Sequence, residues 1–181
     1  MRMETSNEAL AKAASDGDRA AFSQLLCSNY DRLFSLAFRL TGSRAEAEDL
    51  TQDVCLALPD KLKGFEGTAR FTTWLYRVVV NAAHDRRRRQ ATYARAASNW
   101  GEVEVARFAE NADQKEATDW LNTAMSRLNP DLRDTLALII DDELTHAEAG
   151  EVLGISEGTV SWRLSKARKT LRALHETEQQ I

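Results

Sequence analysis

The sequence predicts an all-α protein with two small helical domains joined by a linker. Apolar residues recur at three- and four-residue steps through most of the chain, as on the buried face of a helix. Glycine (8 residues) and proline (2 residues) are too scarce for the many tight turns of an all-β fold. The length of 181 residues fits one domain or two small ones.

The composition is that of a folded protein with an uneven distribution of charge. Hydrophobic residues make up 43% and charged residues 29%, which argues against global disorder. The net charge of −4 gives no sign of nucleic-acid binding. However, residues 1–95 carry 15 basic and 12 acidic side chains, residues 114–181 carry 8 and 12, and the basic ones gather in two tight clusters.

The cysteines and the N-terminus limit the kinds of site and the compartment. Cys27 and Cys55 lie far apart among apolar neighbours, without a CxxC pair or a nearby histidine pair. We therefore expect small buried side chains rather than a disulfide or a metal site. The first residues lack the apolar core of a signal peptide, and no apolar run approaches the ~18 residues of a membrane helix. We expect a cytoplasmic protein that does not insert into membranes.

Two helices and their stop signals are predicted in the first 60 residues. Apolar periodicity predicts a helix from Asp18 to Leu40, ended by Thr41-Gly42. Ser43 and Glu46 form a capping-box pattern that begins a second helix, expected to end near Pro59. Its buried stripe is predicted to be Ala47, Leu50, Val54 and Leu58, and its opposite face presents Asp49, Gln52, Asp53 and Leu56.

A third helix, over about residues 71–90, follows a glycine-containing loop at 64–70. It is predicted to bury Trp74, Leu75, Val78, Val79 and Ala82, and to present Arg77, Asn81, His84 and Arg88 on another stripe. The helix ends in four consecutive arginines at 86–89. One or two basic residues are enough to interact favourably with the helix dipole, so four indicate an additional partner.

The second half begins after residues 91–113, which lose the strong period and are interpreted as a linker that part of a helix can enter. Periodicity returns from Thr118 to Leu128, and Asn129-Pro130 opens a further helix to Asp141. Thr145 and Glu148 form a second capping box before a short helix that runs through Val152.

The C-terminal pattern is that of a helix-turn-helix. A short turn, Leu153-Gly154-Ile155, separates the helix after Thr145 from one capped by Ser156 that runs to about His175. Residues 158–172 carry five basic side chains and no acid, whereas residues 131–157 carry eight acids and one base. This separation suits a second helix placed in the major groove of DNA. An ordinary helical hairpin with a basic solvated face is the competing interpretation.

Several motifs occur together in an order that resembles the extracytoplasmic-function sigma factors of bacterial RNA polymerase. The motifs are AEDLTQDV (47–54), FEG (65–67), FTTWLYRV (71–78), NAAHDRR (81–87), GISEGTV (154–160) and RLSKAR (163–168). The resemblance covers roughly residues 18–90 and 115–175. It implies a first domain (region 2) at 1–92, a linker at 93–113 and a second domain (region 4) at 114–181.

The resemblance also implies partners and binding residues. Region 2 of such proteins binds the polymerase clamp and melts the −10 promoter element; region 4 binds the −35 element and the flap. The implied clamp-binding residues are Asp49, Gln52, Asp53 and Leu56. The implied −10 residues are Phe65, Arg70, Arg77, Asn81, His84, Arg87 and Arg88. The implied −35 residues are Ser161, Trp162, Arg163, Ser165, Lys166 and Arg168. An anti-sigma factor is a further implied partner; no cofactor, metal or small-molecule substrate is implied.

Some of these residues have a plainer interpretation. Phe65 and Trp74 could be core anchors, His84 an incidental surface residue, and Asp49 and its neighbours an ordinary solvated face. Trp162 could pack on the linker or on region 2 rather than read DNA, since a large apolar ring is unusual in a polar groove.

The sequence also departs from the family pattern. Pro59 stands where an aromatic residue is usual, and Ser161-Trp162 replaces a basic residue followed by a small polar one. Ala149-Gly150 replaces a bulkier pair, so we expect the first helix of the motif to be less well packed. No long extension follows Ile181, so we expect no third, sensory domain.

The function predicted is a promoter-recognition subunit that is not itself an enzyme. A sigma-like decoy that titrates an anti-sigma factor is one alternative, and a stand-alone helix-turn-helix regulator is another. A decoy would not need the arginine run at 86–89, and a stand-alone regulator would leave the first half unexplained. An enzyme is disfavoured because the three histidines are dispersed and no catalytic, metal-ligand or P-loop spacing is present.

Overall fold

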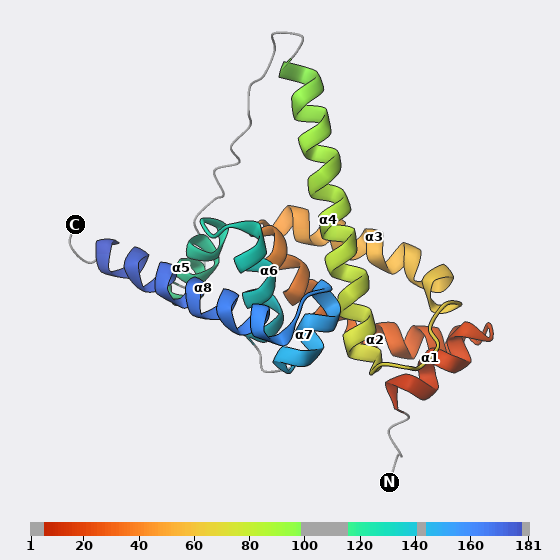
Figure 1. Ribbon diagram of the computed structural model, residues 1–181. Coiled ribbons are helices and arrows are strands. Elements are labelled where there is room, and N and C mark those ends of the chain that lie inside the picture. The colour runs from red at the N-terminus through yellow and green to blue at the C-terminus, as the bar shows by residue number, and fades with distance from the viewer. Residues whose placement is uncertain (1–5, 99–115, 141–143, 179–181) are drawn as a thin grey trace.

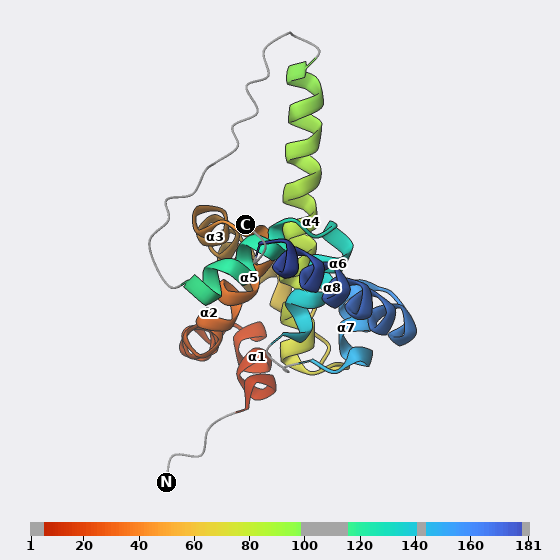
Figure 2. The same cartoon turned by 90° about the vertical axis from the view of Figure 1, so that its left-hand side faces the viewer.

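The computed structural model describes residues 6–98, 116–140 and 144–178, and within these ranges it contains eight helices and no strand (Figure 1). The all-α prediction is therefore confirmed for the described part of the chain. The first four helices form one bundle, and the last four pack against one side of it (Figure 2).

The N-terminal bundle consists of α1 (Asn7–Ser15), α2 (Arg19–Thr41), α3 (Arg44–Leu62) and α4 (Phe71–Ser98). Asp18 caps α2 by accepting hydrogen bonds from the N–H groups of Ala20 and Ala21. Gly42 ends α2 in the left-handed conformation, with φ of 75°, as the Thr41-Gly42 signal predicts. The predicted stripe of α3, from Ala47 to Leu58, is fully buried.

The C-terminal half consists of α5 (Glu116–Ser126), α6 (Pro130–Ile139), α7 (His146–Leu153) and α8 (Glu157–Glu178). Pro130 begins α6, as predicted, and the Asn129 side chain caps it. The capping box of Thr145 and Glu148 is complete, with both reciprocal bonds formed. Gly154 ends α7 with φ of 67°, so α7 and α8 form the predicted helix-turn-helix. The predicted end of α6 at Asp141 lies outside the described residues.

Two predicted helix ends are wrong. Helix α3 continues through Pro59 to Leu62. The buried side chain of Leu62 offsets the hydrogen bond that the proline removes. Helix α4 continues beyond residue 90 to Ser98, and Figure 1 shows this end extending away from the bundle. Residues 91–96 are exposed, so the high helix propensity of the alanines there, rather than packing, supports the helix. Residues 99–113 of the predicted linker lie outside the described residues.

One element was not predicted at all. Helix α1 is capped by Ser6 and buries Leu10 and Ala11 against the bundle. Asn29 of α2, itself buried, exchanges hydrogen bonds with Asn7 of α1. The short helix therefore belongs to the N-terminal core.

The expectation of looser packing at Ala149-Gly150 is also wrong. Both residues are buried, and an added Cβ at Gly150 would lie 2.7 Å from the carbonyl oxygen of Ile155. The backbone N–H of Ile155 in turn donates to the Gly150 carbonyl at 3.0 Å. A small pair here lets the turn fold tightly back onto α7.

The two halves share one hydrophobic core. Helix α2 contacts α5 and α6, and α4 contacts α7. Phe34 and Phe38 of α2 line a groove together with Leu121 and Met125 of α5. The C-terminal half therefore covers one side of α4 (Figure 2).

Candidate polymerase and nucleic-acid interfaces

The face of α3 predicted to bind the polymerase clamp is open. Asp49, Gln52, Asp53 and Leu56 are all exposed, and Leu56 is 81% exposed. The guanidinium of Arg86 in α4 lies 2.9 Å from the Asp49 carboxylate and 3.5 Å from that of Asp53. This face is thus acidic with an apolar centre, which suits a basic helix with an apolar stripe.

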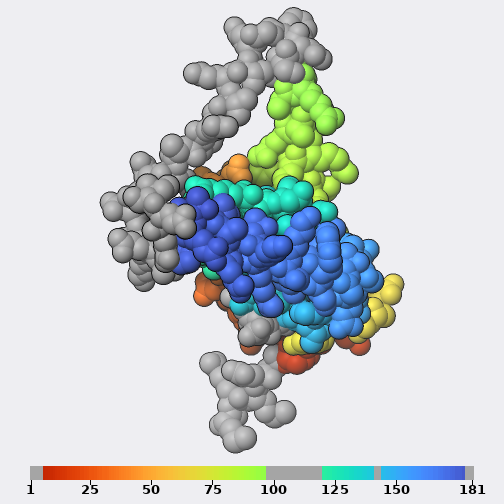
Figure 3. Space-filling view, turned by 60° about the vertical axis from the view of Figure 1, so that its left-hand side comes forward, coloured from red at the N-terminus to blue at the C-terminus, as the bar shows by residue number. Residues whose placement is uncertain are grey.

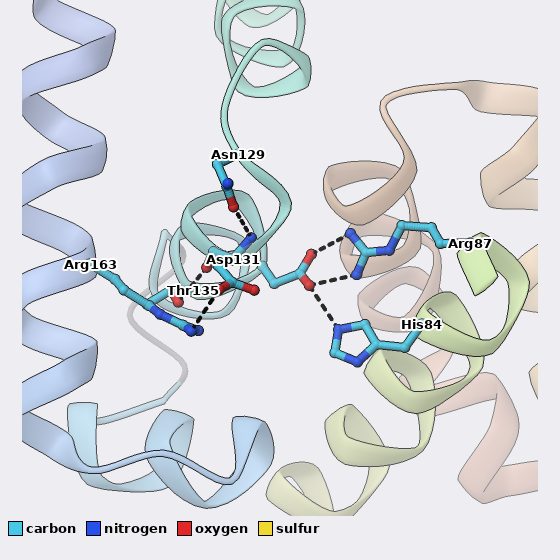
Figure 4. Close-up of polar contacts among 7 residues, drawn as sticks. His84, Arg87, Asn129, Asp131, Thr135 and Arg163 are labelled. Carbon is cyan, nitrogen blue, oxygen red and sulfur yellow. Dashed lines mark hydrogen bonds and ion pairs between the residues drawn. The ribbon is translucent and has the colours of Figure 1, made fainter. Parts of the chain in front are cut away.

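Some basic residues of α4 contact the C-terminal half. The Nε2 atom of His84 lies 2.8 Å from the Asp134 carboxylate in α6. The Arg87 guanidinium donates to both oxygens of that carboxylate, at 3.0 and 2.5 Å. In Figure 4 both side chains point from α4 toward α6. The Asp134 side chain is only 4% exposed, whereas those of His84 and Arg87 are 47% and 28% exposed, so the carboxylate is buried and its partners remain partly open to solvent.

Two further basic residues reach α7. The Arg77 guanidinium donates to the backbone carbonyl of Glu151 at 3.1 Å, and Arg70 pairs with Glu148 at 3.0 Å. Arg88 is exposed and pairs with Asp85 of its own helix, and Asn81 is exposed. Four of the seven predicted −10 residues therefore contact the second half.

Phe65 lies in an aromatic cluster at the loop before α4. Its ring centroid is 5.7 Å from that of Phe71 and 5.2 Å from that of Trp74. Phe71 is fully buried, whereas Phe65 and Trp74 are half-buried. The core-anchor interpretation of Trp74 agrees with this packing, and Phe65 keeps one side accessible.

Helix α8 runs along the face of the molecule that Figure 3 shows, and most of the predicted −35 residues on it are exposed to solvent. Ser161, Trp162, Ser165, Lys166 and Arg168 are exposed. The Lys166 ammonium lies 5.0 Å above the ring of Trp162, which is 59% exposed. Arg163 stands apart, because its side chain is 17% exposed and pairs with Asp131 of α6 at 2.9 Å (Figure 4).

Next to these residues is a hollow with basic walls between α7 and α8. It is lined by His146, Ser161, Leu164, Ser165, Arg168, Lys169 and Arg172. The Nδ1 atom of His146 lies 3.0 Å from the Ser161 hydroxyl. Sequence reasoning passed over His146, since a lone histidine inside a capping box carries no signal of its own.

Sequence reasoning also missed the carboxylates that position the basic stripe. Glu8 of α1 accepts the backbone N–H of Phe71 at 3.2 Å, and so holds the start of α4. Hydrogen bonds from its own backbone N–H and from that of Phe71 lower the pKa of Glu8. In the sequence Asp134 is only one of several acids in its segment, because its contacts are with residues 47 and more positions away.

The electrostatics around Asp134 include a second arginine. Burial lowers the pKa of Arg133, the nearby Arg87 charge lowers it further, and Asp134 and Glu46 act in the opposite direction. The guanidinium groups of Arg87 and Arg133 therefore both lie near the Asp134 carboxylate.

The Glu148 carboxylate has a lowered pKa, chiefly because it accepts the N–H of Thr145, with Arg70 contributing less.

Nothing in the described parts of the chain gathers three metal-ligating side chains in one place. Among the same residues, no helix is long and apolar enough to cross a membrane.

Comparisons with known proteins agree with this architecture. The family model described as Sigma-70 region 2 matches residues 25–93, and the model described as Sigma-70, region 4 matches residues 124–173. The ECF RNA polymerase sigma factor SigM of Mycobacterium tuberculosis (strain Erdman) is 34% identical, over 96% of this chain and 86% of its own length. SigW of Bacillus subtilis, also an ECF RNA polymerase sigma factor, is 28% identical over 89% of this chain and 92% of its own.

Solved structures match in fold across both halves. The sigma factor RpoE of Bartonella quintana, solved with the anti-sigma factor NepR, matches with a TM-score of 0.71 and 24% identity, over 86% of this chain and 96% of that one. CnrH, solved with the cytosolic domain of CnrY, matches with a TM-score of 0.70 and 23% identity, over 94% and 97%. Sigma factors are DNA-binding transcription factors rather than enzymes. With both sigma-70 regions matched and a close relative along nearly its whole length, the chain belongs to the extracytoplasmic-function sigma factors of the sigma-70 family.

Proposed function

We propose that this chain binds core RNA polymerase through α3 and directs it to promoters through α4 and α8, catalysing nothing itself. The observation that carries the proposal is the open row of polar and basic side chains on α8, with the exposed Trp162 among them, in the second helix of a helix-turn-helix. Such a helix, placed in the major groove, brings side chains to base edges and to phosphates.

The assignment of side chains follows their exposure and chemistry. The exposed acidic and apolar face of α3 would bind a basic helix of the clamp. Phe65 and the α4 residues Arg77, Asn81, His84, Arg87 and Arg88, with Arg70 before them, would contact the −10 strand. The α8 residues Ser161, Trp162, Ser165, Lys166 and Arg168 would contact the −35 element. Arg163 fits this surface least well, because Asp131 holds it away from the exposed row.

We propose the domain boundaries 1–92, 93–113 and 114–181 on the basis of the two matched regions. Helix α4 crosses the first of these boundaries, so the linker would begin as a helix. The site of action would be the cytoplasm, where polymerase and chromosome are.

An anti-sigma factor is the proposed regulatory partner. The matched sigma factor RpoE of Bartonella quintana was solved with the anti-sigma factor NepR, which supports the same class of partner here. The decoy alternative is disfavoured by the arginine run at 86–89 and by the open face of α8, since a titrating decoy needs no phosphate contacts.

In vitro transcription tests the proposal. Core polymerase, with and without the purified chain, would transcribe a library of random promoter fragments, and the RNA 5′ ends would be sequenced. We expect initiation at a discrete set of sites that share −10 and −35 sequences, only when the chain is present. Binding to core without any gain in initiation would favour the decoy. Binding to DNA without core would favour a stand-alone regulator.

A further inference from the structure

We propose that Arg86, the first arginine of the run at 86–89, is a positioning residue for the polymerase interface on α3 and does not bind promoter DNA. It bridges the carboxylates of Asp49 and Asp53 and holds them in place for a basic helix of the clamp. This inference rests on the proposed function, because it takes α3 as the surface that binds core polymerase.

The four arginines at 86–89 do not form one surface. Successive residues of an α-helix are about 100° apart around its axis, so neighbours in a run point to different sides. Arg87 turns toward α6, and Arg88 pairs with Asp85 of its own helix. Arg86 turns toward α3. The run therefore supplies side chains to different partners, and Arg86 is directed at the clamp-binding face.

Arg86 contacts both acids of that face. Its Nη2 atom lies 2.9 Å from the Oδ2 atom of Asp49, and its Nη1 atom lies 3.5 Å from the Oδ2 atom of Asp53. Asp49 and Asp53 are four residues apart on α3, so their side chains are neighbours whose like charges repel. A guanidinium between them offsets this repulsion and can donate to both through its planar fork. Arg86 therefore fixes the two carboxylates relative to each other.

The Arg86 side chain is itself held by the bundle. It is 27% exposed, and its Nε atom is buried without a hydrogen-bond partner among the described residues. Arg86 lines a groove between α3 and α4 together with apolar side chains of both helices, among them Leu50, Val54 and Ala82. Long basic side chains pack their aliphatic stems on apolar surface and keep the charged end in water. The guanidinium thus reaches the α3 acids from a stem that packing orients.

Asp49 and Asp53 remain available to a partner while Arg86 holds them. Their side chains are 64% and 67% exposed, and each carboxylate has a second oxygen that can accept hydrogen bonds. Leu56, three residues after Asp53 on the same face, is exposed as well. One positive charge beside two negative ones leaves this face acidic. A basic clamp helix would therefore meet two ordered carboxylates beside an apolar contact.

Such a bridge matters more for binding than for folding. Exposed ion pairs add little to the stability of a fold, because solvent screens them and because ordering their side chains costs entropy. Side chains at an interface must be ordered when the partner binds, so carboxylates that are already ordered lose less entropy at that step. Loss of Arg86 should therefore lower the affinity for core polymerase more than it lowers the stability of the chain.

The test measures binding of the labelled chain to core polymerase, without DNA, for Arg86→Ala and Arg88→Ala. We expect Arg86→Ala to weaken binding about tenfold. Arg88→Ala also removes an arginine that pairs with an acid, and it should bind core like the wild type while forming fewer promoter complexes. Urea unfolding reports the stability of each variant.

Arg86→Lys is the conservative variant. Lysine keeps the charge and a long stem but has one nitrogen in place of the fork, so it should recover only part of the lost affinity. It tests the proposal even where alanine destabilises the bundle. Full recovery with lysine would overturn the two-carboxylate bridge.

A double-mutant cycle shows whether Arg86 acts through the two acids. In a chain that carries both Asp49→Asn and Asp53→Asn, Arg86→Ala should cause no further loss of core affinity, because no carboxylate remains to be positioned. Low salt keeps the weaker complexes measurable. A loss of the same size in both backgrounds would overturn the proposal, since Arg86 would then act independently of the acids. Unchanged or tighter binding of Arg86→Ala in the wild-type background would overturn it too.

Promoter binding separates this role from a phosphate contact. Holoenzyme assembled with a saturating amount of Arg86→Ala should keep the wild-type slope of log promoter affinity against log salt concentration. A slope smaller in magnitude by about 0.7–0.9 would place Arg86 on a DNA phosphate and overturn the proposal.

Asp53→Arg distinguishes failure of this inference from failure of the proposed function. If Asp53→Arg weakens core binding and Arg86→Ala does not, only the positioning role of Arg86 is wrong. If neither variant changes core affinity, α3 is not the polymerase interface, and the proposed function fails together with the role of Arg86.

Discussion

The backbone of Gly150 in α7 lies so close to the carbonyl oxygen of Ile155 that a Cβ at Gly150 would sit 2.7 Å from that oxygen. Real side chains essentially never make so short a contact, and the atom it meets belongs to backbone rather than to a flexible side chain. The turn of the helix-turn-helix is therefore specified by a residue inside the first helix, in addition to Gly154 in the turn itself.

We expect Gly150→Ala to destabilise the protein by about 1–3 kcal/mol, because the turn must shift to admit the methyl group. Gly158→Ala, on the first turn of α8, is the matched control. A Cβ there meets nothing nearer than the Ser156 hydroxyl at 3.9 Å, so alanine should be neutral or stabilising by up to about 1 kcal/mol. Urea unfolding measures both changes. Equal stability of the two variants would show that the turn has room to adjust.

Gly150 also shows where sequence reasoning stops. The sequence predicts a loss of packing at Ala149-Gly150, because the residue types show the missing side-chain volume but not the distance between two backbone segments. The helices after α1, the caps at Ser43 and Thr145, and the helix-turn-helix are predicted from local spacing, and the structure confirms them. At Ser43 only one bond of the predicted capping box forms, from the Glu46 N–H to the Ser43 hydroxyl. The Ser43 N–H donates to the Thr41 hydroxyl instead of to the Glu46 side chain.

The contacts between the halves could not be predicted in this way. His84 and Arg87 read as free DNA-binding side chains because their partner, Asp134, lies 47 or more residues away in an acidic segment. A local pattern can identify a basic stripe, but it does not say whether another part of the chain covers it. For the same reason the sequence does not predict the hydrogen bond that Glu8 accepts from the Phe71 N–H, because the two residues belong to different helices.

The clamp interface gives a second prediction. Asp53→Arg should leave the fold intact, because the side chain is 67% exposed, and should weaken binding to core polymerase strongly. The charge-matched control is Asp31→Arg at an exposed position of α2, which should bind core like the wild type. Fluorescence titration of labelled chain with core gives both affinities. If Asp53→Arg has the circular dichroism of the native fold and binds core polymerase with unchanged affinity, α3 is not part of the interface.

Acid should weaken the capping box of α7 through Glu148 and, to a smaller extent, the pair of Glu148 with Arg70. Its pKa is lowered below the usual value of 4.5, mainly by the Thr145 N–H. A group with a depressed pKa in the folded state stabilises the fold above its unfolded pKa, and this stabilisation is lost as pH falls through the folded pKa. Glu148→Gln should therefore be less stable than the wild type at neutral pH, and the difference should shrink below about pH 4.5.

Urea unfolding of both proteins over a pH series measures this difference. Glu151→Gln, an exposed position on the same helix, is the control. A gap between wild type and Glu148→Gln that stays constant down to acid pH would show that the mutation acts through packing rather than through the charge of the carboxylate.

The last prediction separates base reading from phosphate binding on α8. Trp162 is 59% exposed, and Lys166 stacks on its ring at 5.0 Å, so the ring is not packed on any described part of region 2. In a major groove the indole can contact a thymine methyl but cannot make the two-pronged hydrogen bonds that arginine makes to guanine. Trp162→Arg should therefore change the preferred −35 sequence, shifting single base pairs by about 1–3 kcal/mol.

Arg168 is the matched comparison, because it is exposed on the same helix but lines the basic hollow between α7 and α8. If Arg168 binds phosphate, Arg168→Ala should weaken binding to all −35 sequences about equally. The slope of log affinity against log salt concentration should then fall in magnitude by about 0.9, the value for one lost phosphate contact. Selection from a randomised −35 element with each holoenzyme gives the sequence preference, and a salt series gives the slope. An unchanged preference for Trp162→Arg would mean that the ring lies outside the groove and that the helix is rotated from the position proposed here.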